Sequence, residues 1–261
     1  MQRTLIVPNL HEIPEVFQDL FSSSDVYDSS CSPEARVYFI DKDAGYYLKT
    51  APKNSLQTEA SLTTYFHSKG LAAKVLTYHS FEKDWMLTER VHGEDCTHAM
   101  YLENPKRLCD TSAELLRALH ETDFTNCPVP NHTEKYLKTV HKNYTSGEYD
   151  KTCFPDSFGY ASAEEAISIV RQYGHLLKSD TLLHGDYCLP NIMLDNWKFS
   201  KFIDLGNGGV GDRHVDLFWG IWTLFFNLKT NRFATRFLDA YGRDKIETDL
   251  LKVVAACEVF G

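Results

Sequence analysis

The chain has 261 residues, of which 43% are hydrophobic and 24% are charged, and these fractions are ordinary for a folded globular protein. Such a composition excludes a collagen-like repeat, a coiled coil and a disordered chain. The formal charge of −9, from 27 basic and 36 acidic residues, argues against a protein that binds nucleic acid, because such proteins need a basic surface. A cationic small molecule matches this charge better, although a net negative charge is also simply a way for a protein to stay soluble.

The cysteine pattern and the apolar runs indicate the compartment. The 7 cysteines contain no C-x-x-C pair, and their scatter does not resemble a disulfide framework. The first residues lack the apolar stretch of a signal peptide, and the longest apolar run, residues 217–226, is shorter than the roughly 18 residues that span a bilayer. We therefore expect a cytoplasmic protein that does not bind membranes and is a monomer or weak dimer.

The first ninety residues alternate β-branched or aromatic clusters with turn residues, which predicts strands around one helix. In chain order we expect strands at 26–27, 36–40 and 46–49, a helix at 55–69, and strands at 74–79 and 84–89.

After Gly93 the apolar residues recur at helical spacing. We expect helices at 105–120, 132–144, 163–178, 211–228, 232–241 and 247–258, interrupted by a strand-rich stretch at 181–205. The predicted fold is therefore α+β, with a β-rich lobe (residues 1–92) packed against a mainly helical lobe (residues 93–261) and a ligand cleft between them.

The segment from Leu183 to Gly206 carries the clearest chemical pattern. Asp186 is followed five residues later by Asn191, and Asp204 stands between apolar residues and Leu-Gly. Phosphoryl transfer needs one carboxylate to accept a hydroxyl proton, and an amide oxygen with a second carboxylate to hold Mg²⁺. Each residue alone is typical of a turn, but the three together at this spacing favour a phosphotransferase. A hairpin of strands at 191–195 and 199–203 would bring Asp204 back beside Asn191.

The sequence resembles the aminoglycoside phosphotransferase family, which shares the protein-kinase-like fold, and more narrowly the 3'-phosphotransferases that act on kanamycin and neomycin. The resemblance covers most of the chain, and its segments are residues 31–38, 47–49, 116–120, 184–191, 203–206, 210–213 with Asp216, and 237–242.

The resemblance implies a bilobal kinase-like fold that uses ATP, with GTP as an alternative, and Mg²⁺. It assigns Asp186 as the catalytic base, Asn191 and Asp204 as metal ligands, and the following nucleotide-binding residues: Ser32, Tyr47, Lys49, Glu59, Glu89 and Val91. Asp216 is expected to brace the catalytic loop. Independently of the resemblance, a lysine on an apolar strand is costly unless it is paired, and Glu59 supplies a partner for Lys49.

An aminoglycoside carries several ammonium groups, so its site needs carboxylates. By the resemblance these come from a loop ahead of the His-Gly-Asp motif and from the C-terminus, which gives the predicted acceptor residues Asp150, Asp156, Glu258 and Phe260. The chain departs from its relatives in the helix after Asp216. There it has Trp222, Phe225, Phe226 and Asn227, where several relatives place arginine and acidic residues.

The leading hypothesis is an ATP-dependent kinase that phosphorylates a hydroxyl of an aminoglycoside, the 3'-hydroxyl first of all, and thereby confers resistance. One alternative is a kinase of the same fold for another cationic acceptor. The other is a nucleotide-binding pseudokinase, against which the complete set of Lys49, Asp186, Asn191 and Asp204 argues.

Overall fold

The computed structural model describes residues 3–22, 24–150 and 159–261, and these form two compact units. The first unit contains residues 1–98 together with residues 190–206, and the second contains residues 99–189 and 207–261. The hairpin at 190–206 therefore belongs to the β-rich unit, although the predicted division at residue 93 groups it with the helical part of the chain.

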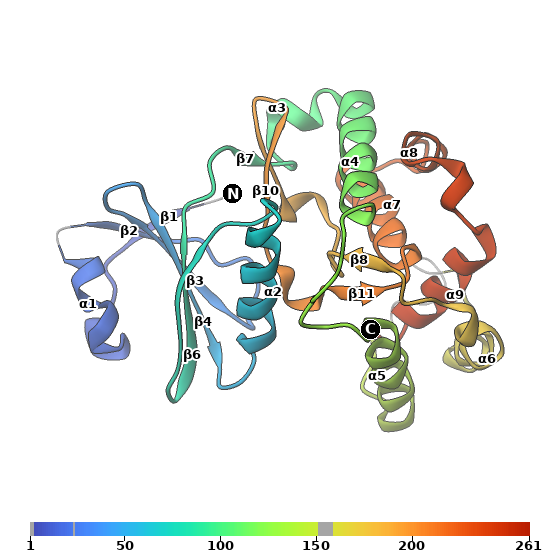
Figure 1. The fold of residues 1–261 in the computed structure, drawn as a ribbon, viewed down its shortest axis with the longest axis horizontal. Coiled ribbons are helices and arrows are strands. Elements are labelled where there is room, and N and C mark those ends of the chain that lie inside the picture. Colours follow the sequence, from blue (N-terminus) through green and yellow to red (C-terminus); the bar gives the residue numbers. More distant parts are fainter. Residues whose placement is uncertain (1–2, 23, 151–158) are drawn as a thin grey trace. The chain divides into compact units, whose positions relative to one another are not determined.

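A six-stranded antiparallel sheet forms most of the first unit, in the order β1-β2-β3-β4-β6-β5 (Figure 1). Its elements are β1 (Thr4–Ile6), α1 (Glu15–Phe21), β2 (Asp25–Asp28), β3 (Arg36–Asp41), β4 (Tyr46–Pro52), α2 (Gln57–Ser68), β5 (Val75–Ser80) and β6 (Lys83–Glu89). A three-stranded sheet in the order β10-β9-β7 follows, from β7 (Glu94–Asp95), β9 (Ile192–Asp195) and β10 (Lys198–Phe202).

Side chains of the large sheet alternate between its two faces, and this alternation directs Lys49. Leu48 is fully buried in a cluster that includes Phe17 and Phe21 of α1. Ala51 packs in a different cluster, with residues at the start of α2. Because Lys49 lies one residue from Leu48 and two from Ala51, its side chain shares the face of the sheet that α2 covers.

Helices make up most of the second unit. Its elements are α3 (Ala99–Leu102), α4 (Pro105–His120), α5 (His132–Ser146), α6 (Ala163–Tyr173), β8 (Thr181–Leu183), β11 (Gly209–Gly211), α7 (His214–Leu228), α8 (Ala234–Tyr241) and α9 (Thr248–Glu258). One core cluster joins residues of α5, α6, α7 and α9, and β8 pairs with β11 in a short antiparallel ladder. None of the described helices has the length and apolar character needed to cross a bilayer.

The predicted elements are largely confirmed, and the differences have local causes. The helix predicted at 211–228 begins only at His214, because residues 209–211 pair with β8 instead. The helix predicted at 163–178 ends at Tyr173, where Gly174 opens a 3₁₀ turn. Strand β1 and helix α1 were not predicted, since their short apolar patterns give no clear period.

Candidate active site

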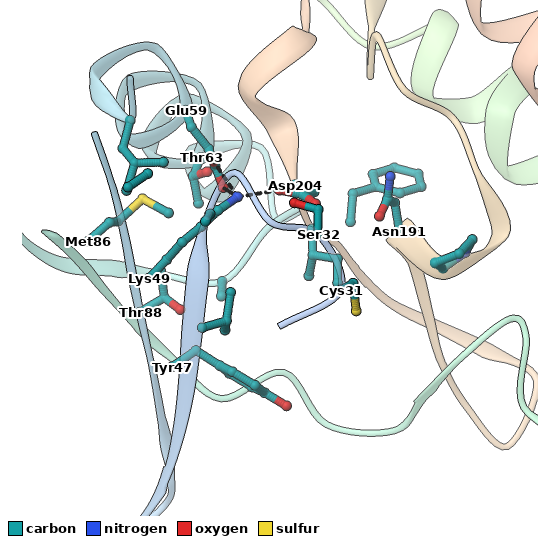
Figure 2. Close-up of a pocket in the computed structure, with 18 of the residues that line it drawn as sticks. Cys31, Ser32, Tyr47, Lys49, Glu59, Thr63, Met86, Thr88, Asn191 and Asp204 are labelled. Carbon is teal, nitrogen blue, oxygen red and sulfur yellow. Dashed lines mark hydrogen bonds and ion pairs between the residues drawn. The ribbon is translucent and has the colours of Figure 1, made fainter. Parts of the chain in front are cut away.

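A cavity of about 810 Å³ opens in the first unit, among α2, the strands β4 and β6, and the segment 190–204 (Figure 2). It contains most of the side chains that the sequence assigns to the nucleotide. Those that line it are Ser32, Tyr47, Lys49, Glu59, Val91, Asn191 and Asp204.

Lys49 joins two carboxylates inside this cavity (Figure 2). Its ammonium lies 2.8 Å from Oε2 of Glu59 and 2.5 Å from Oδ1 of Asp204. Burial alone would lower the pKa of Lys49, but the charges of Glu59 and Asp204 outweigh burial and raise this pKa. Lys49 is therefore a permanent cation, held where it can meet phosphate oxygens.

Asn191 and Asp204 flank the β9–β10 hairpin. Because β9 and β10 are antiparallel, with Phe202 opposite Ile192, the two ends of the hairpin lie close together. The backbone amide of Ile203 donates to the carbonyl of Asn191 at 3.1 Å, so Asp204 follows directly beside Asn191. The side chain of Asp204 is 53% exposed, so its carboxylate is open to a ligand.

These two residues suit Mg²⁺. The described residues hold no cluster of three histidine, cysteine or acidic side chains that would form a complete metal cage. Mg²⁺ does not require one, because it is usually held by one or two protein oxygen ligands together with phosphates and waters. An amide oxygen and a carboxylate on one hairpin are donors of the right kind.

The turn after β2 presents one of its serines to the cavity. Ser30 is used within the turn, since its hydroxyl accepts from the amide of Val37 at 2.9 Å and its amide donates to Asp28 at 2.9 Å. Ser29 is buried. Ser32 is exposed and lines the cavity, which agrees with the choice of Ser32 from the sequence.

Many of the residues that line the cavity are apolar, which suits a base. Tyr47 lines the cavity, and the Tyr47 hydroxyl accepts from the guanidinium of Arg3 at 2.6 Å. Val91 also lines it, whereas Glu89 is exposed and is not among the lining residues. Sequence reasoning missed Met86 and Thr88, which also line the cavity, because the pattern of β6 indicated only a core strand.

The His-Gly-Asp loop of the second unit is held by one buried carboxylate. Asp216 accepts from the amide of His184 at 2.7 Å and from the amide of Gly185 at 2.8 Å, and it pairs with Nε2 of His120 at 3.2 Å. Burial would raise the pKa of Asp216, but these hydrogen bonds and the neighbouring histidines hold the pKa below its usual value. The prediction that Asp216 braces the loop is confirmed.

The loop backbone also demands glycine next to Asp186. Gly185 has φ +83°, and a Cβ there would lie 1.8 Å from the carbonyl oxygen of Asn207. The Asp186 amide in turn donates to Nδ1 of His184 at 3.3 Å, so His184 is a structural residue that shapes the loop. The backbone that leads into Asp186 is thus tightly constrained.

Substitution of Asp216 is expected to destabilise the second unit. In Asp216→Asn, an amide NH₂ replaces a carboxylate oxygen that faces backbone donors, and we expect a loss of about 2 kcal/mol or more in the free energy of unfolding. Urea unfolding measures this loss. Asp239→Asn is the control, since its side chain is 59% exposed and its ion pair with Arg243 should contribute less than about 1 kcal/mol. Equal stability of the two variants would contradict the bracing role.

The predicted acceptor residues divide into three groups. Glu258 is partly buried, and Tyr136 donates its hydroxyl to Oε1 of Glu258 at 2.7 Å. Asp150 lies exposed in the loop after α5, and Asp156 falls outside the described residues. The ring of Phe260 is fully buried against Tyr144, so any contact of Phe260 with an acceptor would come from its backbone.

Glu258 has two neighbours that the sequence did not reveal. Tyr136 comes from α5 and Trp219 from α7, and both hydrogen-bond the carboxylate. Burial, with the charge of Asp186 adding to it, raises the pKa of Glu258 to about 7. Residues this far apart in the chain share no spacing that a sequence pattern could have shown.

A partly buried lysine paired with a helix glutamate, two oxygen donors on a hairpin and a hydrogen-bonded loop that carries an aspartate are the groups that phosphoryl transfer requires. The class of protein is therefore a phosphotransferase with the kinase-like fold. More particularly, the chain belongs to the phosphotransferase enzyme family called APH, whose family model matches residues 33–252.

Individual relatives agree with this family. The chain is 50% identical to a Lactococcus lactis protein named as a probable aminoglycoside 3'-phosphotransferase, over 97% of both chains. It is 28% identical to the aminoglycoside 3'-phosphotransferase of Niallia circulans, over 86% of this chain and 87% of the relative. Among solved structures, the type VIII aminoglycoside-3'-phosphotransferase superposes with a TM-score of 0.78 at 19% identity, over 97% of this chain and 99% of the other. The predicted kinase-like fold is thereby confirmed.

Proposed function

We propose that this protein transfers the γ-phosphoryl group of ATP to a hydroxyl of an aminoglycoside antibiotic, the 3'-hydroxyl first of all, and so confers resistance. The observation that carries the proposal is the Lys49–Glu59–Asp204 cluster in one cavity with Asn191. The names of the relatives support the acceptor class, since the Niallia circulans relative is named as a 3'-phosphotransferase and the Lactococcus lactis relative as a probable one. ADP, AMP-PNP, streptomycin and hygromycin B are bound in solved structures of more distant members.

In the proposed reaction, a bond forms between the acceptor oxygen and the γ-phosphorus while the bond from that phosphorus to the β-bridging oxygen breaks, which leaves ADP. Asp186 takes the proton of the acceptor hydroxyl. Lys49 meets the α- and β-phosphates, with Glu59 fixing its position. Mg²⁺ held by Asn191 and Asp204 would neutralise charge on the phosphate oxygens.

We propose that the first unit binds the nucleotide. In this proposal Ser32 contacts the phosphates and Tyr47 stacks on the base, while the backbone groups of Glu89 and Val91 hydrogen-bond the edge of the base. The second unit supplies Asp186 and the acceptor residues Asp150, Asp156, Glu258 and Phe260. Use of GTP in place of ATP, cytoplasmic location and a monomeric or weakly dimeric state stay predictions from the sequence.

An ADP-release assay with kanamycin, neomycin, amikacin, choline and homoserine tests the proposal, each acceptor being supplied with ATP and then with GTP. We expect release with at least one aminoglycoside, and NMR of the product should place the phosphate on the 3'-oxygen. Release with choline or homoserine alone would favour the other acceptor class, and no release with any acceptor would favour the pseudokinase.

The pKa of Glu258 predicts a pH dependence of acceptor binding. Since this pKa is raised to about 7, Glu258 is neutral below that pH and anionic above it. We expect the kanamycin KM to fall as the pH rises from 6 to 8, because the anion attracts ammonium groups.

The ammonium groups of the antibiotic also titrate, so Glu258→Gln is the control for this experiment. The difference between the pH profiles of the kanamycin KM in wild type and variant isolates the contribution of Glu258. The nucleotide KM should show no such difference. Parallel pH profiles of the two proteins would remove Glu258 from acceptor binding.

A further inference from the structure

Helix α7 carries three aromatic rings in a row, and we call Trp219, Trp222 and Phe226 the aromatic ladder. The ring centroids of Trp219 and Trp222 are 5.3 Å apart with an edge-on geometry, and those of Trp222 and Phe226 are 5.0 Å apart and nearly parallel. Their spacing of three and four residues places the rings along one side of the helix. The ladder is thus an ordered surface rather than three separate exposed side chains.

One end of the ladder lies at the groups that surround the catalytic aspartate. Trp219 hydrogen-bonds Glu258, and the charge of Asp186 acts on Glu258. Thr223 stands one turn after Trp219, and its hydroxyl accepts from the amide of Leu189 at 3.1 Å, three residues after Asp186. The ladder therefore begins beside the loop that presents Asp186.

The other end of the ladder already binds a cation. The ammonium of Lys229 lies 4.2 Å from the ring centroid of Phe226, which is cation–π distance. Lys229 ends α7 in the left-handed conformation, with φ 54°. Phe226 is 51% exposed, so an ammonium group from solution can reach the ring face that Lys229 covers once the Lys229 side chain moves away.

We propose that the aromatic ladder determines acceptor specificity: an amino-sugar ring of the substrate packs on Trp222 and Phe226, and its ammonium group replaces that of Lys229 on the Phe226 ring. The inference rests on the proposed function. Aromatic faces carry partial negative charge, so they attract ammonium groups and also pack against the apolar faces of sugar rings. The ladder continues the attraction that begins at Glu258 without adding further carboxylates.

Phe226 has a matched neighbour for the test. Phe225 is 49% exposed, but it lies about 100° around the helix and lines a hollow with Ile221, Trp222 and Leu251 in which Phe226 takes no part. We expect Phe226→Leu to raise the kanamycin KM and its calorimetric Kd by about 2- to 30-fold, the range of a cation–π contact. Phe225→Leu should leave both constants within about twofold of wild type, which is the lower limit of the effect of a cation–π contact. Phe226→Tyr keeps an aromatic ring and should restore the binding that Phe226→Leu loses. The nucleotide KM should be unaffected throughout.

Lys229 gives a second, independent measurement. Lys229→Gln should lower the kanamycin KM, because the substrate no longer competes with the resident ammonium. If Lys229 acts by covering the ring, this gain should vanish in the Phe226→Leu background, whereas a gain that comes only from reduced charge repulsion would persist there.

The outcomes separate the two proposals. Wild-type turnover of kanamycin with equal KM values for Phe226→Leu and Phe225→Leu overturns the ladder and leaves the proposed function in place, as does a Lys229→Gln gain that persists in the Phe226→Leu background. A wild-type enzyme that phosphorylates no aminoglycoside overturns the proposed function itself.

Discussion

Asp186→Asn is expected to lower kcat by about 10²-fold or more, because the amide cannot accept the proton of the acceptor hydroxyl. The affinity for the magnesium–nucleotide complex should stay within a few-fold of wild type, since the groups that we propose for the phosphates and the metal lie on the other unit, at Lys49, Asn191 and Asp204. Steady-state kinetics and calorimetric titration with a non-hydrolysable ATP analogue measure the two quantities separately.

Asp180→Asn is the control for this substitution. Asp180 is exposed and precedes β8, the strand that leads into the His-Gly-Asp loop. Its substitution therefore removes the same charge from the same unit as Asp186→Asn does. Its kcat should match wild type. A near-normal kcat for Asp186→Asn would exclude Asp186 as the base and leave proton removal to solvent.

Asp204→Ala is expected to weaken magnesium-dependent nucleotide binding by at least about 10²-fold. Loss of an outer-shell partner of a metal ligand already costs about 10- to 100-fold, and Asp204 is a proposed direct ligand. Because the ammonium of Lys49 keeps its contact with Glu59 at 2.8 Å, the cavity should not collapse. Calorimetric titration with and without Mg²⁺ gives the change.

Asp195→Ala serves as the comparison, since Asp195 is an exposed carboxylate at the tip of the same hairpin. It should bind the nucleotide as wild type does in both conditions. If Asp204→Ala keeps the full magnesium dependence, the metal is held by other residues and the assignment of Asn191 loses its basis too.

The sequence predicted those parts of the fold that repeat a local pattern. The helix expected at 105–120 is observed as Pro105–His120, because its apolar residues keep helical spacing from end to end. Helix α1 was missed, since it is only 7 residues long and is stabilised by contacts of Phe17 and Phe21 with the sheet. A pattern within one segment carries no information about such contacts.

The same distinction applies to the site. Lys49 and Glu59 lie 10 residues apart on a strand and the next helix, and their pairing was expected from the family resemblance and from the cost of an unpaired lysine on an apolar strand. Tyr136 meets Glu258 across 122 residues, and nothing in the spacing of either residue predicts that contact. Likewise, a run of aromatic residues after Asp216 could be read as apolar, but not as an ordered stack that holds a lysine.

Residues 190–206 belong to the first unit although they come late in the chain, and this affects how the protein folds during synthesis. The chain crosses from one unit to the other after residues 98, 189 and 206, so neither unit is a continuous stretch of sequence. During synthesis, the sheet that carries Lys49 emerges early, but Asn191 and Asp204 follow only after most of the helical unit, several seconds later at about 5–20 residues per second. A nascent chain that ends before residue 190 therefore has the lysine and its glutamate but lacks both proposed metal ligands, and on this proposal magnesium–nucleotide stabilises the protein only near the end of translation.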